Sequence, residues 1–168
     1  MKKLSTFVFA LFTAAALTSC GPTSEDAINY NDSLINEINK VIQADNKFVE
    51  AEDKGGDEMK SAHQSLIQQV NTALENIKKV GPFDKKSDFL DASVKYLTTY
   101  KGVVENEYKQ MVDISSKPDD QKTEDDDAAY NKAQDASRDK MKTAEDEFTK
   151  VQQDFSKQYK FKFKSDSL

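Results

Sequence analysis

The chain has 168 residues, with 24 Lys and Arg against 30 Asp and Glu, which gives a formal net charge of −6. It contains one His, one Cys and no Trp. An acidic chain without a basic face argues against nucleic-acid binding, and a single Cys excludes an intramolecular disulfide.

The first 19 residues have the features of a secretory signal. Lys2 and Lys3 form a positively charged start, and an apolar run extends from Phe7 to Leu17. The run is shorter than the ~20 apolar residues that span a bilayer, but it suits the apolar part of a signal peptide. We expect residues 1–19 to be removed, which leaves 22 Lys and Arg against 30 acids and a net charge of −8.

Leu17-Thr18-Ser19-Cys20 resembles the lipobox of bacterial lipoproteins, in which an apolar residue and two small residues precede a Cys. The resemblance implies cleavage before Cys20, attachment of lipid to its thiol and acylation of the new amino group. Residues 20–25 would then form a lipidated tether that holds the protein at a membrane. The alternative is an ordinary signal peptide with a chance Cys near its cleavage site.

Four stretches after the tether place apolar residues at spacings of three, four and seven, the pattern of amphipathic helices. Gly55-Gly56, Gly81-Pro82 and the Ser115–Pro118 stretch separate them. We expect Asp57 to cap the second helix and Thr123 to begin the fourth, with Asp126 three residues later. Short connections between long helices predict an all-α fold, an antiparallel up-down-up-down four-helix bundle over residues 26–158. The expected helices are 26 to about 54, 57–80, 84 or 87 to 114, and 123–158.

Polar residues interrupt the apolar stripes and are the candidates for a ligand site. Asn31 and Asp45 share the heptad position of Ile38, and His63 and Glu107 lie in the stripes of the second and third helices. Together these four side chains could bind a small ligand or a metal within the bundle. The simpler interpretation places them at the edges of the stripes. A di-metal bundle site draws on paired Glu-x-x-His motifs, which this chain lacks, so we predict no resident metal or cofactor.

Catalytic motifs are absent from the sequence, which has no Gly-rich phosphate loop, nucleophile elbow or His-Glu-x-x-His motif. We therefore predict that the protein is not an enzyme. The acidic stretch from Asp119 to Asp127 lacks the spacing of a calcium loop, and we interpret it as a solvated loop followed by an acidic first helical turn. Weak cation binding there is the alternative.

Residues 159–168 form a basic-aromatic tail that contains Lys160, Phe161, Lys162, Phe163 and Lys164. In an up-down bundle the fourth helix ends beside the start of the first, so the tail should lie at the membrane-proximal end. One hypothesis is that these five residues contact lipid headgroups. The alternative is a helix end whose Phe161 covers the core.

Two family resemblances add to this interpretation. The Cys20–Asp26 segment resembles the export signal of surface lipoproteins in the Bacteroidota. The mature chain is similar to uncharacterised surface lipoproteins of the Bacteroidota and spirochaetes through Tyr30-Asn31-Asp32, Pro82-Phe83 and the Tyr100–Tyr108 segment. The second resemblance implies a helical envelope lipoprotein and brings no known activity.

Two hypotheses of function follow. The first is an outer-membrane lipoprotein, facing the cell surface, whose bundle binds an envelope protein or a cell-surface component through its sides or its distal loops. The second is a periplasm-facing carrier that holds a ligand inside the bundle with Asn31, Asp45, His63 and Glu107. Inward-pointing positions for these four side chains would favour the carrier, and a dry apolar core would favour the interaction module.

Overall fold

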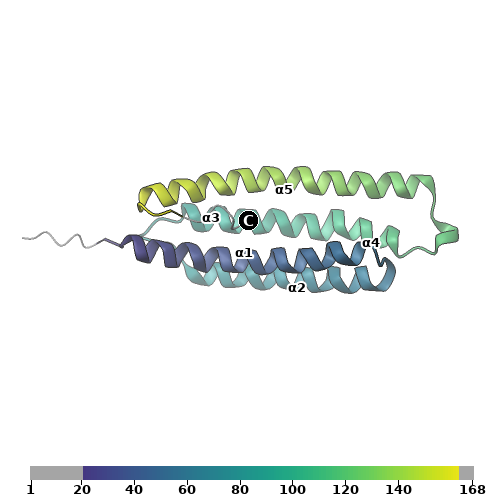
Figure 1. The fold of residues 1–168 in the computed structure, drawn as a ribbon, viewed down its shortest axis with the longest axis horizontal. Helices are drawn as coiled ribbons and strands as arrows, with labels where there is room; N and C mark the ends of the chain where they lie inside the picture. The colour runs from purple at the N-terminus through teal and green to yellow at the C-terminus, as the bar shows by residue number, and fades with distance from the viewer. Residues whose placement is uncertain (1–20, 163–168) are drawn as a thin grey trace, which may run out of the picture.

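The computed structural model describes residues 21–162, and these form four long helices packed side by side (Figure 1). The first two are α1 (Ser24–Glu52) and α2 (Gly56–Val80). The third runs through α3 (Asp88–Val103), a π-helical segment η1 (Val104–Tyr108) and α4 (Lys109–Ser115), and the fourth is α5 (Glu124–Gln158). The helices alternate in direction, which confirms the predicted all-α bundle.

The helices do not pack equally closely. The α1 backbone lies against α2, α2 lies against α3, and α3 lies against α5, whereas α1 and α5 make few close backbone contacts. Side chains fill this wider seam between α1 and α5, including a hydrogen bond from Gln152 to Asn31 of 2.9 Å. The α1–α5 seam is therefore held together by side chains, with little close approach of the two backbones.

Apolar side chains from all four helices form one continuous core. Each of the largest contributes about 1.5–3 kcal/mol by its removal from water. The most deeply buried are Leu34, Ile38, Val41, Phe48, Met59, Leu66, Val70, Ile77, Leu97, Met111 and Phe148. An aromatic cluster, in which Phe155 contacts Tyr30, Phe83, Phe89 and Tyr159, continues the core to the end of the bundle where α1 begins.

The connection between α1 and α2 differs from the prediction at one residue. Gly55 is the N-cap of α2 with a φ of 62°, and no side chain caps this helix. Asp57 lies within the first turn, so the prediction that it caps the helix was wrong. A positive φ favours Gly because a Cβ is strained there, and Gly55 and Gly56 both adopt it.

The connection between α2 and α3 begins at Gly81, whose carbonyl accepts a 2.8 Å hydrogen bond from the Tyr30 hydroxyl. Phe83 and Lys86 then exchange two backbone hydrogen bonds around Asp84 and Lys85, which have φ values of 49° and 62°. Positive φ at both central residues is characteristic of a type I′ turn. The turn directs the Phe83 ring against Tyr30, with ring centroids 4.9 Å apart.

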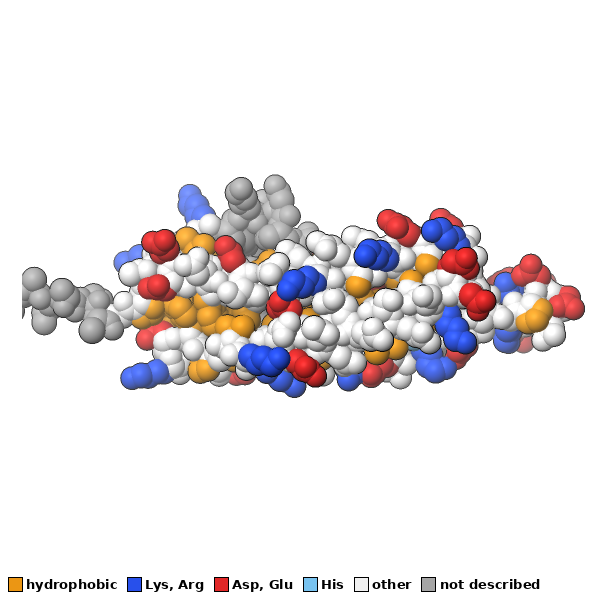
Figure 2. Space-filling model, turned by 90° about the horizontal axis from the view of Figure 1, so that it is seen from below, with side chains coloured by type: hydrophobic (Ala, Val, Ile, Leu, Met, Phe, Trp, Pro, Cys, Tyr) orange, Lys and Arg blue, Asp and Glu red, His pale blue; other side chains and the backbone are white. Residues whose placement is uncertain are grey.

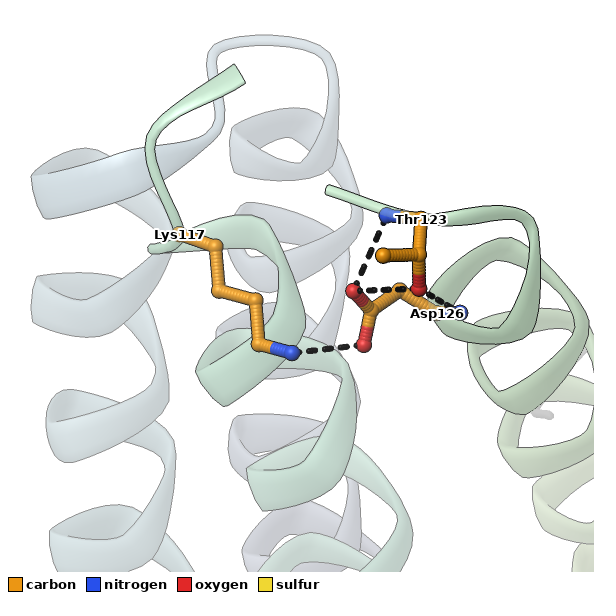
Figure 3. A network of polar contacts seen from close by, with 3 residues as sticks. All are labelled: Lys117, Thr123 and Asp126. Carbon is orange, nitrogen blue, oxygen red and sulfur yellow. Dashed lines mark hydrogen bonds and ion pairs between the residues drawn. The ribbon is translucent and has the colours of Figure 1, made fainter. Parts of the chain in front are cut away.

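The predicted start of the last helix is confirmed at Thr123 (Figure 3). The Thr123 hydroxyl accepts a 3.2 Å hydrogen bond from the Asp126 backbone N–H, and the Asp126 carboxylate accepts one of 3.1 Å from the Thr123 backbone N–H. Lys117 adds a 2.6 Å ion pair to the same carboxylate. This capping box joins the end of α4 to the start of α5 across the short η2 helix (Asp119–Gln121). A second capping box at Thr23 starts α1 two residues before the expected Asp26.

Candidate functional site

The four polar residues proposed as a ligand site do not converge on one point. Asn31 lies 14 residues before Asp45 on α1, about 21 Å away along the helix axis. Its side-chain oxygen accepts the hydrogen bond from Gln152, and both side chains are buried. This pair satisfies the polar atoms that α1 and α5 bring together near one end of the seam. The placement gives Asn31 a structural role in joining the two helices.

His63 is held by the backbone of the π-helical segment. Its Nε2 atom lies 2.7 Å from the carbonyl oxygen of Val104, the first residue of η1, and the imidazole is buried. A carbonyl oxygen only accepts hydrogen bonds, so Nε2 must carry the proton and cannot ligate a metal at the same time. Asn106 similarly donates to the Gly102 carbonyl at 2.6 Å. Two side chains thus satisfy carbonyls where the helix widens.

Glu107 lies within η1 and forms an ion pair with Lys140 of α5, with 2.7 Å between Oε1 and Nζ. Its other oxygen, Oε2, is buried without a hydrogen-bond partner among the described residues. The ion pair ties the π-helical segment to α5. Glu107 is therefore engaged with α5 through Lys140 and does not line the pocket that Asp45 faces.

Asp45 is the one member of the set that faces a pocket. This cavity of about 210 Å³ lies in the α1–α5 seam, and its floor is formed by tyrosines of α3 and η1. We call it the Asp45 pocket. It is lined by Ile42, Asp45, Tyr96, Tyr100, Tyr108, Ser137, Arg138 and Met141. Three helices thus contribute to a single opening at the side of the bundle.

The Asp45 carboxylate is poorly compensated in this position. Its Oδ1 atom is buried, and no hydrogen-bond donor within residues 21–162 reaches it. Burial raises the pKa of Asp45 above its usual range, and the hydroxyl groups of Tyr100 and Tyr108 act in the opposite direction without cancelling the effect. Arg138 also lines the pocket, but its ion pair is with the neighbouring Asp135 at 3.6 Å. A buried carboxylate with one oxygen left without a partner costs stability, so it needs an explanation.

The surroundings of the pocket are negative. Burial, followed by the charges of Glu145 and Asp45, raises the pKa of Tyr96 to about 12. Burial and the Asp45 charge also raise the pKa values of Tyr100 and Tyr108, so all three phenols stay protonated at neutral pH. Glu52, one heptad after Asp45, has a raised pKa because of its burial and the Asp45 charge. The pocket therefore presents neutral aromatic hydroxyls around an excess of carboxylates.

The π-helical segment explains how Tyr108 reaches this pocket. One extra residue in a helical turn rotates everything after it by about 100° relative to a continuous α-helix. Tyr108 is the last residue of η1, and its ring stacks on Phe48 with a centroid distance of 4.5 Å and an interplanar angle of 12°. Sequence analysis expected one continuous third helix up to residue 114 and did not find the π-helical segment. The consecutive four-residue steps from Tyr100 to Val104 to Tyr108 are the one signal that could have indicated it.

A larger groove of about 750 Å³ lies between α3 and α5, but its polar groups are satisfied or solvated. Lys95 and Glu147, which line it, pair with each other and are both more than half exposed. None of the residues that line this groove has a buried polar side-chain atom without a hydrogen-bond partner. The smaller Asp45 pocket is the better candidate because the Oδ1 atom of Asp45 has no such partner.

The described part of the tail folds back onto the bundle. Lys160 has a φ of 58°, and the Phe161 N–H donates to the Ser156 carbonyl at 3.0 Å, which is the Schellman arrangement at a helix end. The Phe161 ring packs edge-on against Phe155 at 5.8 Å, while Lys160 and Lys162 are exposed. Phe161 thus covers the core, as the alternative interpretation expects. Phe163, Lys164 and the proposed lipid-attachment residue Cys20 lie outside the described residues.

The described residues 21–162 contain no group of three or more His, Cys, Asp or Glu side chains placed to hold a metal ion. No helix within the same range is both long and apolar enough to cross a bilayer. The arrangement around Asp45 can bind a ligand by charge and aromatic contact. Comparison with protein-family models, with curated proteins and with solved structures finds no match for this chain.

Proposed function

We propose that this protein is a non-enzymatic lipoprotein of the bacterial outer membrane, anchored through Cys20, whose bundle recognises an envelope or cell-surface component. The lipobox-like Leu17–Cys20 segment supports the anchor, and the resemblance of Cys20–Asp26 to an export signal of surface lipoproteins motivates the location. The helical domain would then stand outside the bilayer as a binding module on a lipid tether.

The contacts at one end of the bundle support a definite orientation. The Ser24 hydroxyl donates to the Tyr159 carbonyl at 2.7 Å, so the start of α1 lies beside the end of α5. Only Gly21, Pro22 and Thr23 separate Cys20 from α1, and three residues span at most ~11 Å. A lipid on Cys20 would hold this end close to the membrane.

The surface charges agree with this orientation. Exposed lysines from the end of α2, the α2–α3 turn and the end of α5 outnumber the exposed acids Glu25, Asp26, Asp84 and Asp88 at the end that would face anionic lipid. These lysines are Lys78, Lys79, Lys85, Lys86, Lys157, Lys160 and Lys162. Acidic side chains crowd the opposite tip, which contains the α4–α5 connection (Figures 1 and 2). Lysines near a negatively charged bilayer contribute about 1 kcal/mol each at most. They would position the bundle, and Cys20 would supply the anchor.

The observation that carries the recognition role is the buried Asp45 Oδ1 atom, which has no partner among the described residues and lies at the open side of the bundle. Asn31, His63 and Glu107 each have a partner within the protein, and the core between them is packed with apolar side chains. This distribution favours a module that binds at its flank over a carrier that encloses a ligand with all four residues. The flank lies along the side of the bundle, where it stays accessible when one end contacts lipid.

Protease treatment of intact cells, compared with a Cys20→Ala strain, tests the proposed function. We expect the wild-type protein to fractionate with the outer membrane and to be digested from outside, and the Cys20→Ala protein to leave the membrane fraction. Digestion only after permeabilisation would overturn the surface location in favour of the periplasm. Membrane association that survives Cys20→Ala would overturn the lipid anchor.

A further inference from the structure

We propose that the Asp45 pocket binds an organic cation, the ammonium or quaternary ammonium group of a ligand. Three observations converge on this chemistry: a buried carboxylate oxygen without a partner, three tyrosines that line the same cavity, and an opening at the side of the bundle. The inference concerns the helical domain alone, so it stands or falls independently of lipid attachment to Cys20.

The charge of the pocket selects a cation. Asp45 lines the cavity, while Glu52 and Glu145 lie close enough to raise the pKa values of neighbouring groups. Arg138 at the lining pairs with Asp135 and its charge also acts on Glu52, but it leaves the Oδ1 atom of Asp45 unpaired. An anionic ligand would add repulsion to a carboxylate that the tyrosine hydroxyls compensate only in part, whereas a cation removes the remaining cost.

The lining argues for an organic cation over a metal ion. Hard metal ions such as Ca²⁺ take six to eight oxygen ligands, and several of these are normally carboxylates or carbonyls. The Asp45 pocket offers one carboxylate and three protonated phenols. Tyrosine rings instead attract alkylammonium groups through cation–π contact, and a carboxylate beside such rings adds direct charge pairing.

The tyrosines are held in place before any ligand arrives. Tyr108 is stacked on Phe48, and Tyr96 lies against both Tyr100 and Phe148 at centroid distances of 6.2 and 5.3 Å. The π-helical segment sets the direction of Tyr108, and the His63 hydrogen bond to Val104 fixes that segment. Such preorganisation lowers the entropic cost of binding.

The volume of the Asp45 pocket limits the size of the chemical group that it can hold. A cavity of about 210 Å³ corresponds to roughly seven water molecules at ~30 Å³ each. This is room for a trimethylammonium or alkylammonium head group, and the remainder of any larger ligand must extend through the opening. The same chemistry could come from a free amine or from a lysine side chain borne on a polypeptide.

The test is a two-dimensional ¹H–¹⁵N NMR titration of the full-length protein in a non-ionic detergent. The probes are tetramethylammonium chloride and butylammonium chloride, with sodium chloride and neutral tert-butyl alcohol as controls. We expect saturable shifts at the amides of Asp45, Tyr100, Tyr108 and Arg138 with the ammonium probes alone. Absence of such shifts, or equal shifts with sodium chloride, would overturn the proposal.

Two substitutions distinguish binding at Asp45 from a nonspecific effect of the protein's net charge. Asp45→Asn should weaken ammonium binding at least tenfold, and because it removes an uncompensated charge the variant should remain folded. Glu50→Gln makes the same change of charge at an exposed site on α1 and should leave the affinity unchanged. Equal affinity of the wild-type and Asp45→Asn proteins would overturn the proposal.

A third titration, with Nα-acetyl-lysine amide, distinguishes the sources of the cation. Tighter binding of this probe than of butylammonium supports a lysine borne on a polypeptide, and equal or weaker binding supports a free amine. In either case, binding of the ammonium group must depend on Asp45. A Cys20→Ala protein should bind the probes as the wild type does, so failure of the lipid anchor and failure of the pocket give different results.

Discussion

Replacing Asp45 with Asn should stabilise the protein at neutral pH. The Oδ1 atom is buried with no partner among the described residues, and such a group costs about 1–3 kcal/mol, or more when it is charged. Asn has the same shape without the charge but still leaves a polar atom in this place, so only the charge-dependent part of the cost is removed, and we expect the free energy of unfolding to rise by about 1 kcal/mol. For a domain of this size each kcal/mol raises Tm by about 2–4 °C, which predicts an increase of roughly 2–4 °C.

The gain should depend on pH with a definite sign. Because the pKa of Asp45 is raised in the folded protein, the folded state holds its proton more tightly than the unfolded state does. The cost of the charge is therefore fully present above the folded pKa and disappears as pH falls toward the unfolded value of about 3.9. The advantage of Asp45→Asn should disappear over the same interval.

Thermal unfolding followed by circular dichroism at a series of pH values measures this effect. Glu50→Gln, at an exposed site on the same helix, is the control and should change stability by less than about 0.5 kcal/mol. A Asp45→Asn protein that is less stable than wild type at pH 7 would refute the reasoning. It would mean that Tyr100 and Tyr108 compensate the carboxylate and that Asp45 has a structural role.

Substitutions at three further positions test the local structure, and urea unfolding measures the stability of each variant. His63→Leu leaves the Val104 carbonyl without its donor and should cost about 1–3 kcal/mol, while His63→Gln, which keeps a donor, should cost less; equal losses would argue against the hydrogen bond. Lys160→Gly should add about 1 kcal/mol because it relieves a φ of 58°, and a destabilised variant would contradict the Schellman geometry. Thr123→Ala should cost about 1 kcal/mol and Thr123→Ser should cost little, so equal losses would argue against the capping box.

The bundle could be predicted from sequence because its determinants are local. Amphipathic stripes set the helices, Gly81-Pro82 and the stretch before Pro118 end them, and Thr123 with Asp126 caps the last one. Gly55 took the place expected for Asp57 because a glycine with positive φ turns the chain and starts the helix at the same time. The sequence Gly55-Gly56-Asp57 is compatible with a helix that starts at a glycine turn and with one that Asp57 caps, so the sequence alone does not distinguish them.

The candidate site could be predicted only in part. Asp45 was identified as a polar residue on an apolar stripe, but the pocket depends on Arg138 and Met141 of α5, which lie more than 90 residues away in the sequence. The width of the α1–α5 seam and the extra residue of η1 decide which tyrosines reach Asp45. The width of the seam and the position of the extra residue depend on how the helices pack, and the periodicity of apolar residues does not predict either.

The most direct test of the central claim is a ¹³C NMR titration of the Asp45 carboxyl carbon with and without tetramethylammonium. In the free protein we predict a pKa above the usual range of an Asp, because the burial of the carboxylate outweighs the effect of the Tyr100 and Tyr108 hydroxyls. Bound cation should lower the pKa toward that range, since it stabilises the ionised form. An unshifted pKa in the free protein, or a raised pKa that tetramethylammonium leaves unchanged, would contradict the account.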